Sequence, residues 1–437
     1  MDYNEALKYI DTELKGGCNP GLGRIIRLLK LTGNPQNGLK IIHIAGTNGK
    51  GSTAAMISEI LREAGYKVGT YISPHLTNIT ERYLINNIEI EKCRFPYYVD
   101  ILKGKIEHIK ETGEEIPSQF EMLTAMAFLY LKDENVDIAV IEVGLGGRYD
   151  ATNVLNALVT VIMSISFDHM SILGNTIEEI AYEKAGIIKS KGITILYPQK
   201  YSEAEKVIES ISIKMDNRLI KVKKGDVLLK SFGMNGQIMD YSYKGIDYKE
   251  INLPLLGEHQ LLNAAVAITV TAILGDLGYK IDKENIKNGI GNVKWLGRLS
   301  IISNNPLILI DGAHNIDGIT MLASAIKSYF PGKKLILVMG MLKDKEHDKS
   351  LEVIAPLANT FIATEPRDAR ALSAKDLGEE ANKYNHDVKV EPSLEKAIKV
   401  ALSLYSEDSV ICIAGSLYLI GEANNLLNKG VNNLIID

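Results

Sequence analysis

The sequence predicts an α/β protein in which a P-loop-type parallel-sheet domain is followed by a smaller Rossmann-like α/β domain. Three observations predict this fold. A short apolar run, KIIHIA, ends in a glycine-rich turn that precedes a helix-like stretch, STAAMISEILREAG. The apolar runs DIAVIEV and LVTVIMSIS are typical of buried parallel strands. Beyond Arg298 the alternation of strand-like and helix-like runs starts again, which indicates a second α/β unit.

The first unit reads in order as helices, strand, turn, helix and further strands. Two helix-like stretches precede the first strand: one carries Ala6, Ile10 and Leu14 at helical spacing, and the other is LGRIIRLLKL. FEMLTAMAFLYLKD is typical of a crossover helix between parallel strands. Residues 215–252 alternate apolar and polar positions, so we expect a hairpin-rich appendage there. A helix beginning near Glu258 then completes this unit.

The second unit contains four strand-like runs separated by helix-like stretches. The strands are predicted at PLILIDGA, KLILVMG, NTFIAT and SVICIAG, and the helices include GITMLASAIKSYF and LEKAIKVALSL. We therefore predict two domains, residues 1–295 and residues 296–437, with the boundary near Trp295.

Composition excludes several classes of protein. Hydrophobic residues make up 46% and charged residues 24% of the chain, and no window approaches the roughly 18 unbroken apolar residues of a membrane span. A net charge of -5 without a basic block argues against nucleic-acid binding. Cys18, Cys93 and Cys412 are too few for a disulfide framework or a zinc cluster. Because the first residues resemble a mature helix more than a signal peptide, we expect the protein in the cytoplasm, and we expect it to be a monomer.

The turn Gly46-Thr47-Asn48-Gly49-Lys50-Gly51-Ser52 predicts a nucleotide site. It lies between a strand and a helix, where backbone N–H groups can surround a polyphosphate and Lys50 can reach its outer oxygens. The strict Walker spacing is not met, because Gly51 separates Lys50 from Ser52. The alternative is a glycine-rich turn with an exposed lysine.

The loop resembles the GTNGKGS loop of folylpolyglutamate synthases and dihydrofolate synthases, a branch of the Mur ligase superfamily. Other segments resemble this family's motifs and occur in family order from residue 46 to residue 422: TYISPHL, SQFEMLTAMAF, EVGLGGRYDATN, DHMSILG, IAYEKAGIIK, LLGEHQLLNAA, LGRL, IDGAHN, LVMGMLKDK and GSLYLIGE. The resemblance implies a P-loop-type ATPase domain, a Rossmann-like glutamate ligase domain, and ATP and Mg²⁺ as cofactors.

The resemblance also implies the metal ligands. Glu142 ends the strand-like run DIAVIE and so reaches the edge of the sheet where α/β ligand sites form. On the family pattern, Ser73, Glu142, His169 and Lys184 hold Mg²⁺, with Lys184 carbamylated so that it offers oxygen ligands to a second ion. Without that pattern, Glu142 is a solvent-facing carboxylate, His169 a structural hydrogen-bonder and Lys184 a solvated helix lysine.

Nucleotide and substrate residues follow from the same resemblance. The predicted nucleotide contacts are Asn48, Gly49, Lys50, Gly51, Ser52, Thr53, Asn263, Arg298, Asp311 and His314. The predicted substrate contacts are Ser118, Gln119, Phe120, Glu121 and Arg148, whereas Arg148 also suits a structural carboxylate. The predicted catalytic residues are Lys50, His169, Lys184 and Arg298, and an arginine can stabilise charge on a transferred phosphoryl group.

Three positions depart from the family pattern. Tyr149 replaces an aliphatic residue in GGRxDATN, Leu296 stands where many relatives have proline, and Ile316 follows His314-Asn315 where proline is common. None of these changes removes a predicted catalytic group. They leave open the details of substrate contact near Arg148 and of the interdomain linker.

The resulting hypothesis is an ATP-dependent ligase that activates a folate carboxylate as an acyl phosphate and joins it to L-glutamate, with dihydropteroate as a second candidate acceptor. Its partners are then small molecules: folate or dihydropteroate, glutamate and ATP. A Mur-type cell-wall peptide ligase is a rival hypothesis, although only about forty residues precede the loop, where those enzymes carry a further domain. A nucleotide-binding regulatory module and an inactive ligase-like protein are two more rival hypotheses.

Overall fold

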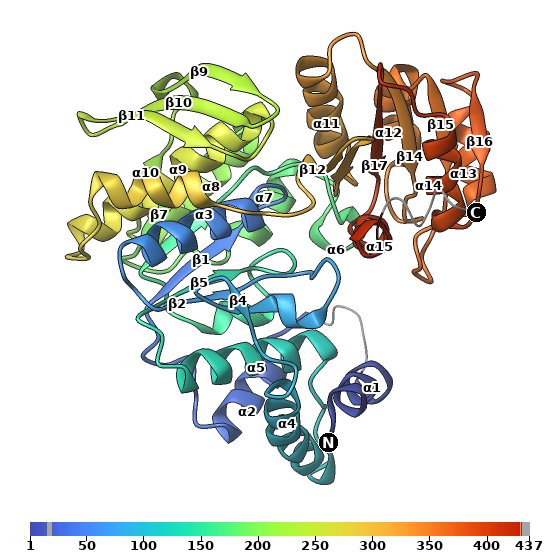
Figure 1. The fold of residues 1–437 in the computed structure, drawn as a ribbon. Helices are drawn as coiled ribbons and strands as arrows, with labels where there is room; N and C mark the ends of the chain where they lie inside the picture. The colour runs from blue at the N-terminus through green and yellow to red at the C-terminus, as the bar shows by residue number, and fades with distance from the viewer. Residues whose placement is uncertain (15–19, 429, 431–437) are drawn as a thin grey trace.

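The computed structural model describes residues 1–14, 20–428 and 430. Two α/β units lie side by side, as Figure 1 shows. We call the unit around the larger sheet the N-terminal lobe and the unit around β12 to β17 the C-terminal lobe. The structure thus confirms the predicted α/β class, while the boundary at residues 295/296 remains a prediction. Cys18 lies outside the described residues.

Among the described residues, eight strands form the large sheet of the N-terminal lobe. Their order is β4-β3-β2-β5-β1-β6-β7-β8. Neighbours from β2 to β8 pair in parallel, and β3 and β4 add an antiparallel edge. The strands are β1 (Ile41–Ala45), β2 (Val68–Tyr71), β3 (Tyr83–Ile85), β4 (Ile88–Glu89), β5 (Ile138–Glu142), β6 (Val159–Ile162), β7 (Ile193–Leu196) and β8 (Arg218–Lys221).

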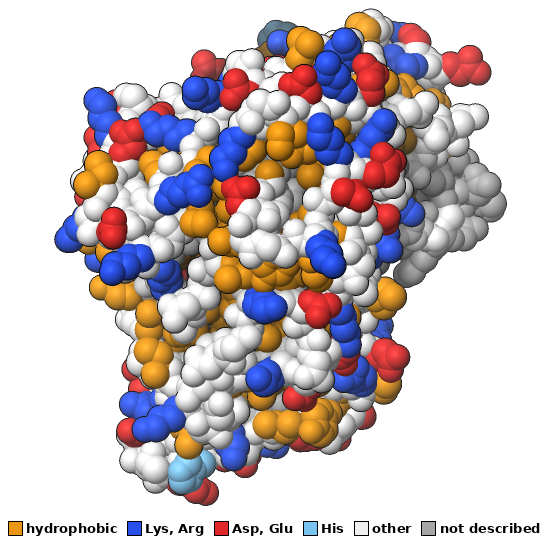
Figure 2. All heavy atoms as spheres, turned by 90° about the vertical axis from the view of Figure 1, so that its left-hand side faces the viewer, with side chains coloured by type: hydrophobic (Ala, Val, Ile, Leu, Met, Phe, Trp, Pro, Cys, Tyr) orange, Lys and Arg blue, Asp and Glu red, His pale blue; other side chains and the backbone are white. Residues whose placement is uncertain are grey.

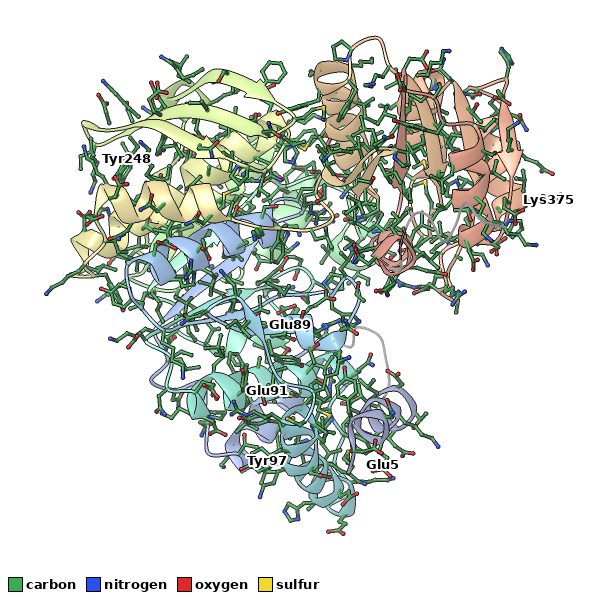
Figure 3. The ribbon with its side chains drawn as sticks, in the orientation of Figure 1. Glu5, Glu89, Glu91, Tyr97, Tyr248 and Lys375 are labelled. Carbon is green, nitrogen blue, oxygen red and sulfur yellow. The ribbon has the colours of Figure 1, made fainter. Side chains whose placement is uncertain are left out.

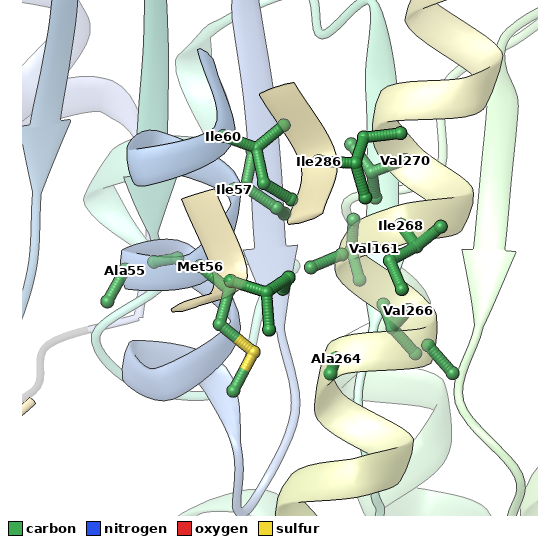
Figure 4. Close-up of a cluster of buried hydrophobic side chains, with 14 of the residues drawn as sticks. Ala55, Met56, Ile57, Ile60, Val161, Ala264, Val266, Ile268, Val270 and Ile286 are labelled. Carbon is green, nitrogen blue, oxygen red and sulfur yellow. The ribbon is translucent and has the colours of Figure 1, made fainter. Parts of the chain in front are cut away.

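Helices cover both faces of this sheet, and β1, β5 and β6 are therefore buried throughout. One face is covered by α3 (Lys50–Glu63), α9 (Glu258–Asp276) and α10 (Lys283–Asn292). Figure 4 shows Ile57, Val161 and Val266 converging in that core. The opposite face carries α1 (Tyr3–Glu13), α2 (Gly23–Leu31), α4 (Phe95–Glu111) and α5 (Gln119–Asp133). A further core under β6 and β7 holds α6 (Met170–Leu173), α7 (Ile177–Ala185) and α8 (Ser202–Lys214).

The hairpin-rich appendage predicted at 215–252 is correct only in its second part. In the described chain, β9 (Val227–Gly233), β10 (Gly236–Tyr243) and β11 (Ile246–Leu253) form a small antiparallel sheet. Residues 218–221 belong instead to the large sheet, as the parallel edge strand β8. The prediction was wrong there because an edge strand needs no continuous apolar run, and Arg218 and Lys221 are exposed.

In the described part of the C-terminal lobe, six strands form a sheet in the order β12-β13-β17-β14-β15-β16, with only β12 antiparallel to its neighbour. The strands are β12 (Ser300–Asn304), β13 (Leu307–Asp311), β14 (Lys334–Met339), β15 (Thr360–Ala363), β16 (Val388–Val390) and β17 (Ser409–Ala414). One face carries α11 (Ile316–Tyr329), α12 (His347–Ile354) and α13 (Ala374–Ala381), and the other carries α14 (Leu394–Ser403) and α15 (Leu417–Asn428).

The surface carries charges of both signs. On the face drawn in Figure 2, lysine and arginine side chains are interspersed with aspartate and glutamate around apolar patches. Figure 3 places Glu5, Glu89 and Glu91 on the N-terminal lobe, and Lys375 far from them on the C-terminal lobe. Within the described chain, every helix is too short or too polar to cross a bilayer.

Candidate active site

The glycine-rich turn at residues 46–52, which we call the phosphate loop, lies at the carboxyl edge of the large sheet, at the point where β1 stands between β5 and β6. Gly46 and Gly49 have φ angles of 150° and 85°, which favour glycine. A Cβ atom at Gly46 would lie 2.5 Å from the Cβ of Met163, and one at Gly49 would lie 2.7 Å from Oδ1 of Asn263. No side chain caps the start of α3, so its first-turn N–H groups remain available to an anion.

Lys50 is held against this loop. Its Nζ donates to the carbonyl oxygens of Gly46 and Thr47, both at 3.2 Å, and lies 3.8 Å from Oε1 of Glu142. Ser52 and Thr53 are buried in the first turn of α3. The Ser52 hydroxyl accepts from Gln260 at 3.4 Å, whereas the hydroxyl of Thr53 has no hydrogen-bond partner within the described residues.

Glu142 and Ser73 lie beside each other at the ends of β5 and β2. The Ser73 N–H donates to Oε2 of Glu142 at 3.3 Å. Burial raises the pKa of Glu142, while Lys50 opposes that shift. The Ser73 side-chain hydroxyl is buried and, among the described residues, has no hydrogen-bond partner. A buried carboxylate beside an unused hydroxyl is a donor set of the hard-oxygen kind that suits Mg²⁺.

His169 and Lys184 approach the loop from the other side. His169 has φ 50°, at the start of α6, and burial lowers its pKa to about 4. Lys184, on α7, is 4% exposed, and its Nζ donates to the Gly46 carbonyl oxygen at 3.0 Å. Burial first, and then the charge of Lys50, lower the pKa of Lys184 to about 7. The solvated-lysine alternative is therefore wrong for Lys184.

These groups line one cavity of about 250 Å³ between the lobes, which we call the central cavity. Its walls include Lys50, Ser73, Glu142, His169 and Lys184 from the N-terminal lobe and His314 from the C-terminal lobe, with Arg298 from the segment joining them. Across the described residues, no three His, Cys, Asp or Glu side chains cluster as a metal site. The predicted ligand set is of another kind, since it combines a serine, a glutamate, a histidine and a modified lysine.

A second, narrow cavity carries the predicted nucleotide contacts Asn48, Gly49, Ser52, Asn263, Arg298 and Asp311. Asn263 donates to Gln260 at 2.9 Å beside Gly49. The carboxylate of Asp311 accepts from the backbone N–H groups of Leu299 at 2.7 Å and Ala313 at 2.8 Å, and burial raises its pKa. Asp311 therefore fixes the linker to β13, in addition to any contact with a nucleotide.

The predicted substrate residues are held by structural contacts. Ser118 and Glu121 form a capping box at the start of α5, and Glu121 pairs with Arg24 at 3.0 Å. Gln119 donates to Asp11 at 3.0 Å. Phe120 approaches the central cavity, because its ring lies against Gly144 in the cavity wall.

Arg148 is likewise engaged with its neighbours. Its guanidinium pairs with Glu183 at 2.6 Å. It also lies over the rings of Tyr149 at 4.4 Å and Tyr182 at 5.0 Å. These contacts agree with the structural-carboxylate alternative, and the substrate role of Arg148 stays a prediction.

Sequence reasoning missed several cavity residues of the C-terminal lobe, among them four with polar side chains that bear on the chemistry. Lys345, Arg370, Ser416 and Tyr418 line the central cavity opposite the loop. Their signals were present in LKDK, in the arginine that precedes Ala371, and in GSLYLIGE, but nothing in the residue types separated them from ordinary surface positions. These four side chains come together only where the two lobes approach each other, in the wall of one cavity.

The comparisons with known proteins cover both lobes. Residues 44–271 match the Mur ligase middle domain, and residues 297–417 match the glutamate ligase domain of Mur ligases. The dihydrofolate synthase/folylpolyglutamate synthase of Bacillus subtilis is 36% identical over 97% of this chain and 99% of its own length. The chain belongs to the folylpolyglutamate synthase/dihydrofolate synthase family of Mur ligases.

Solved structures of this family have the same fold. Mycobacterium tuberculosis folylpolyglutamate synthase complexed with ADP superimposes with a TM-score of 0.90 at 32% identity, over 97% of this chain and 98% of that one. An FPGS–AMPPCP–folate complex superimposes with a TM-score of 0.87 at 30% identity, over 98% of this chain and all of the other. The family predicted from the ordered motifs is thus confirmed, and with it an ATP-dependent ligase.

Proposed function

We propose that this protein is a folylpolyglutamate synthase, which uses ATP to add L-glutamate to the carboxylate of a folate through an acyl phosphate. Dihydropteroate is the second acceptor to be tested. The observation that carries the proposal is the convergence of Lys50, Glu142 and Lys184 at the carboxyl edge of the large sheet, facing Arg298 across one cavity. The solved complexes of relatives with ADP and with AMPPCP and folate support the same substrates.

The loop and Lys50 bind the triphosphate in this scheme. The first-turn N–H groups of α3 and the Lys50 ammonium offset the phosphate charge. Ser73, Glu142 and His169 would hold Mg²⁺, with Lys184 joining them once carbamylated, and the ion would supply charge neutralisation at the phosphates. Asn263 and His314 are proposed to contact the nucleotide, and Arg298 to stabilise charge on the phosphoryl group as it moves.

Bond formation then proceeds in two steps. A folate carboxylate oxygen attacks the γ-phosphorus of ATP in line, the bond to the β–γ bridging oxygen breaks, and ADP leaves. The neutral amine of glutamate attacks the acyl carbon, the tetrahedral intermediate loses phosphate, and the nitrogen gives up its extra proton as the amide forms. Closure of the lobes holds the reactants together and keeps water from the acyl phosphate.

The C-terminal lobe offers a site for the incoming amino acid. Arg370 and Ser416 line the cavity wall opposite Glu142, and an arginine suits a carboxylate of glutamate. Arg370 is held in place by Asp368 at 3.0 Å and by the hydroxyl of Tyr418 at 3.2 Å. We also propose that Ser118 to Glu121 and Arg148 contact the pterin end of the folate, and that the protein works as a monomer in the cytoplasm.

One assay tests the proposal. Purified protein receives ATP, Mg²⁺ and labelled L-glutamate, with tetrahydrofolate, dihydropteroate or a nucleotide-linked cell-wall peptide precursor as separate acceptors. We expect labelled amide with tetrahydrofolate and its loss in Lys50→Ala, whereas Lys8→Ala, at an exposed position of α1, should retain turnover. Product only with the peptide precursor would favour the cell-wall ligase. ATP hydrolysis without any amide would favour the regulatory module.

A further inference from the structure

The carboxylate of Asp168 in the N-terminal lobe is bound by groups of the C-terminal lobe. Lys345 donates from Nζ to Oδ1 at 2.7 Å, and Asn315 donates from Nδ2 to Oδ2 at 3.2 Å. Nε2 of His314 lies 3.8 Å from Oδ2. The neighbouring N–H of His169 is a further donor, at 2.9 Å. Asp168 is therefore the point at which the predicted metal-binding segment meets the other lobe.

The Asp168–Lys345 pair is shielded from water. The two side chains are only 9% and 7% exposed. A second pair across the lobes, Lys200–Asp317, has a similar distance of 2.8 Å, but its lysine side chain is 64% exposed. An exposed pair contributes little to stability, whereas a buried charge that loses its partner is strongly unfavourable. The two pairs thus form a natural comparison.

The same network reaches the phosphate loop. Asn315 exchanges hydrogen bonds with Asn48, with distances of 3.2 Å and 3.3 Å between their side-chain amides. Asn315 also caps α11 by accepting from the N–H of Gly318 at 2.9 Å. One residue of the C-terminal lobe consequently contacts both the loop and Asp168, so the position of the lobe is coupled to both.

A steric contact accompanies the polar ones. The carbonyl oxygen of Leu76 approaches Gly421 on α15 so closely that a Cβ atom at Gly421 would lie 1.9 Å from it. Leu76 belongs to the segment that follows Ser73, another predicted metal ligand. This arrangement of the lobes therefore brings both flanks of the predicted metal site against the C-terminal lobe.

We propose that Lys345 is a positioning residue, whose buried ion pair with Asp168 holds the lobes closed and orients the adjacent His169. The inference rests on the proposed function only for the reaction that closure serves. In the open form, Asp168 and Lys345 are hydrated and neither needs the other. In the closed form, each lacks water and depends on its partner, so the pair favours closure only when both charges are present.

Removal of the lysine charge should shift the lobes toward the open form. Lys345→Met leaves the Asp168 carboxylate shielded without its cation, and we expect the closed population to fall on the order of a hundredfold relative to the open one. Asp168→Asn together with Lys345→Met removes the stranded charge, so the double variant should close better than Lys345→Met alone. Lys200→Met is the matched control.

Small-angle scattering with a non-hydrolysable ATP analogue measures closure without any folate chemistry. We expect a smaller radius of gyration on nucleotide binding for the wild type and for Lys200→Met, little contraction for Lys345→Met, and partial recovery in the double variant. Thermal melting confirms that each variant is folded. Because these arms need no acceptor, they remain decisive if the folate assay fails.

Turnover supplies a second measurement. Lys345→Met should release more phosphate per amide formed and raise the KM for glutamate, because an open site admits water to the acyl phosphate. Contraction and coupling equal to those of Lys200→Met would overturn the proposal. So would a double variant that is no better than Lys345→Met.

Discussion

The side chain of Lys184 donates a hydrogen bond of 3.0 Å to the carbonyl oxygen of Gly46, the first residue of the phosphate loop. This contact joins α7 to the loop through a buried amine. The amine competes with Lys50 for the same carbonyl oxygen, since Lys50 donates to it at 3.2 Å. Burial is the main cause of the lowered pKa of Lys184, and repulsion between the two neighbouring cations adds to it.

We predict that Lys184 reacts with carbon dioxide. The neutral amine attacks CO₂, an N–C bond forms and one proton is released. A pKa of about 7 in place of 10.5 makes the neutral amine abundant near neutral pH. In ¹³C-bicarbonate, a carbamate resonance should therefore grow as the pH rises from about 6 to about 9. It should be missing in Lys184→Ala, and a spectrum of that variant identical to the wild type would contradict the assignment.

The same amine should give stability a pH dependence. Its folded pKa lies below its unfolded value, so the unfolded chain binds the extra proton between about pH 7 and pH 10.5. Stability should accordingly rise with pH through that window, at up to about 1.4 kcal/mol per unit. Lys184→Met should lack this slope in CO₂-free buffer. If the free energy of unfolding changed with pH in the same way in the wild type and in Lys184→Met, the result would argue against a buried amine at Lys184.

Glu142→Gln should weaken metal-dependent turnover. The amide removes a negative charge next to Lys50 and provides a poorer oxygen ligand, so we expect kcat/KM to fall on the order of 10² to 10³ and the Mg²⁺ requirement to rise. A magnesium titration of the ligase assay measures both. Glu111→Gln, at the exposed end of α4, should behave as the wild type. An unchanged magnesium curve in Glu142→Gln would remove Glu142 from the ligand set.

Trp295 provides an optical signal at the phosphate loop. It is the chain's one tryptophan, and a Cβ atom at Gly51 would lie 2.8 Å from its ring. Gly51→Ala should displace the indole ring of Trp295, change the tryptophan fluorescence emission and lower the affinity for ATP about tenfold. Gly104→Ala in α4, where a Cβ atom meets open space, is the control. Equal ATP affinities for the two variants would show that Gly51 has room to spare.

Substitution of Glu121 can distinguish its structural ion pair with Arg24 from the predicted contact with the substrate. Glu121→Gln breaks an ion pair with Arg24 whose side chains are 5% and 11% exposed, and it should lower the free energy of unfolding by about 1–3 kcal/mol. The substrate prediction adds a rise in acceptor KM. Chemical denaturation and steady-state kinetics measure the two effects independently. A destabilised variant with an unchanged KM would leave Glu121 as a scaffold residue.

The sequence predicted the parallel core because its strands are buried on both faces and read as unbroken apolar runs, as at β1 and β5. It did not distinguish β8, whose exposed Arg218 and Lys221 resemble loop residues. The short strands β3 and β4 carry too few residues for a period to emerge. Edge strands are specified by pairing with neighbours, and this information is distributed along the chain.

The residues of the candidate site were likewise predicted only in part from the sequence. The loop and Glu142 follow from local patterns, and the family resemblance added His169 and Lys184. Lys345 was not predicted, because its role depends on Asp168, 177 residues away in the sequence. The residue pattern alone did not indicate that Lys184 is buried, since a lysine in a short helix ordinarily faces water; only the family resemblance placed it in the site.

The anchoring of Arg298 has a consequence for the timing of the reaction. The carbonyl oxygen of Gly297 accepts from the N–H of Gly312 at 2.9 Å, and the N–H of Leu299 is held by Asp311. Both residues flanking Arg298 are thereby hydrogen-bonded to the end of β13. We therefore expect the Arg298 guanidinium to move together with the C-terminal lobe. We therefore predict that its charge reaches the phosphates of a bound nucleotide only when this lobe approaches the loop, so that nucleotide release requires the lobe to move away.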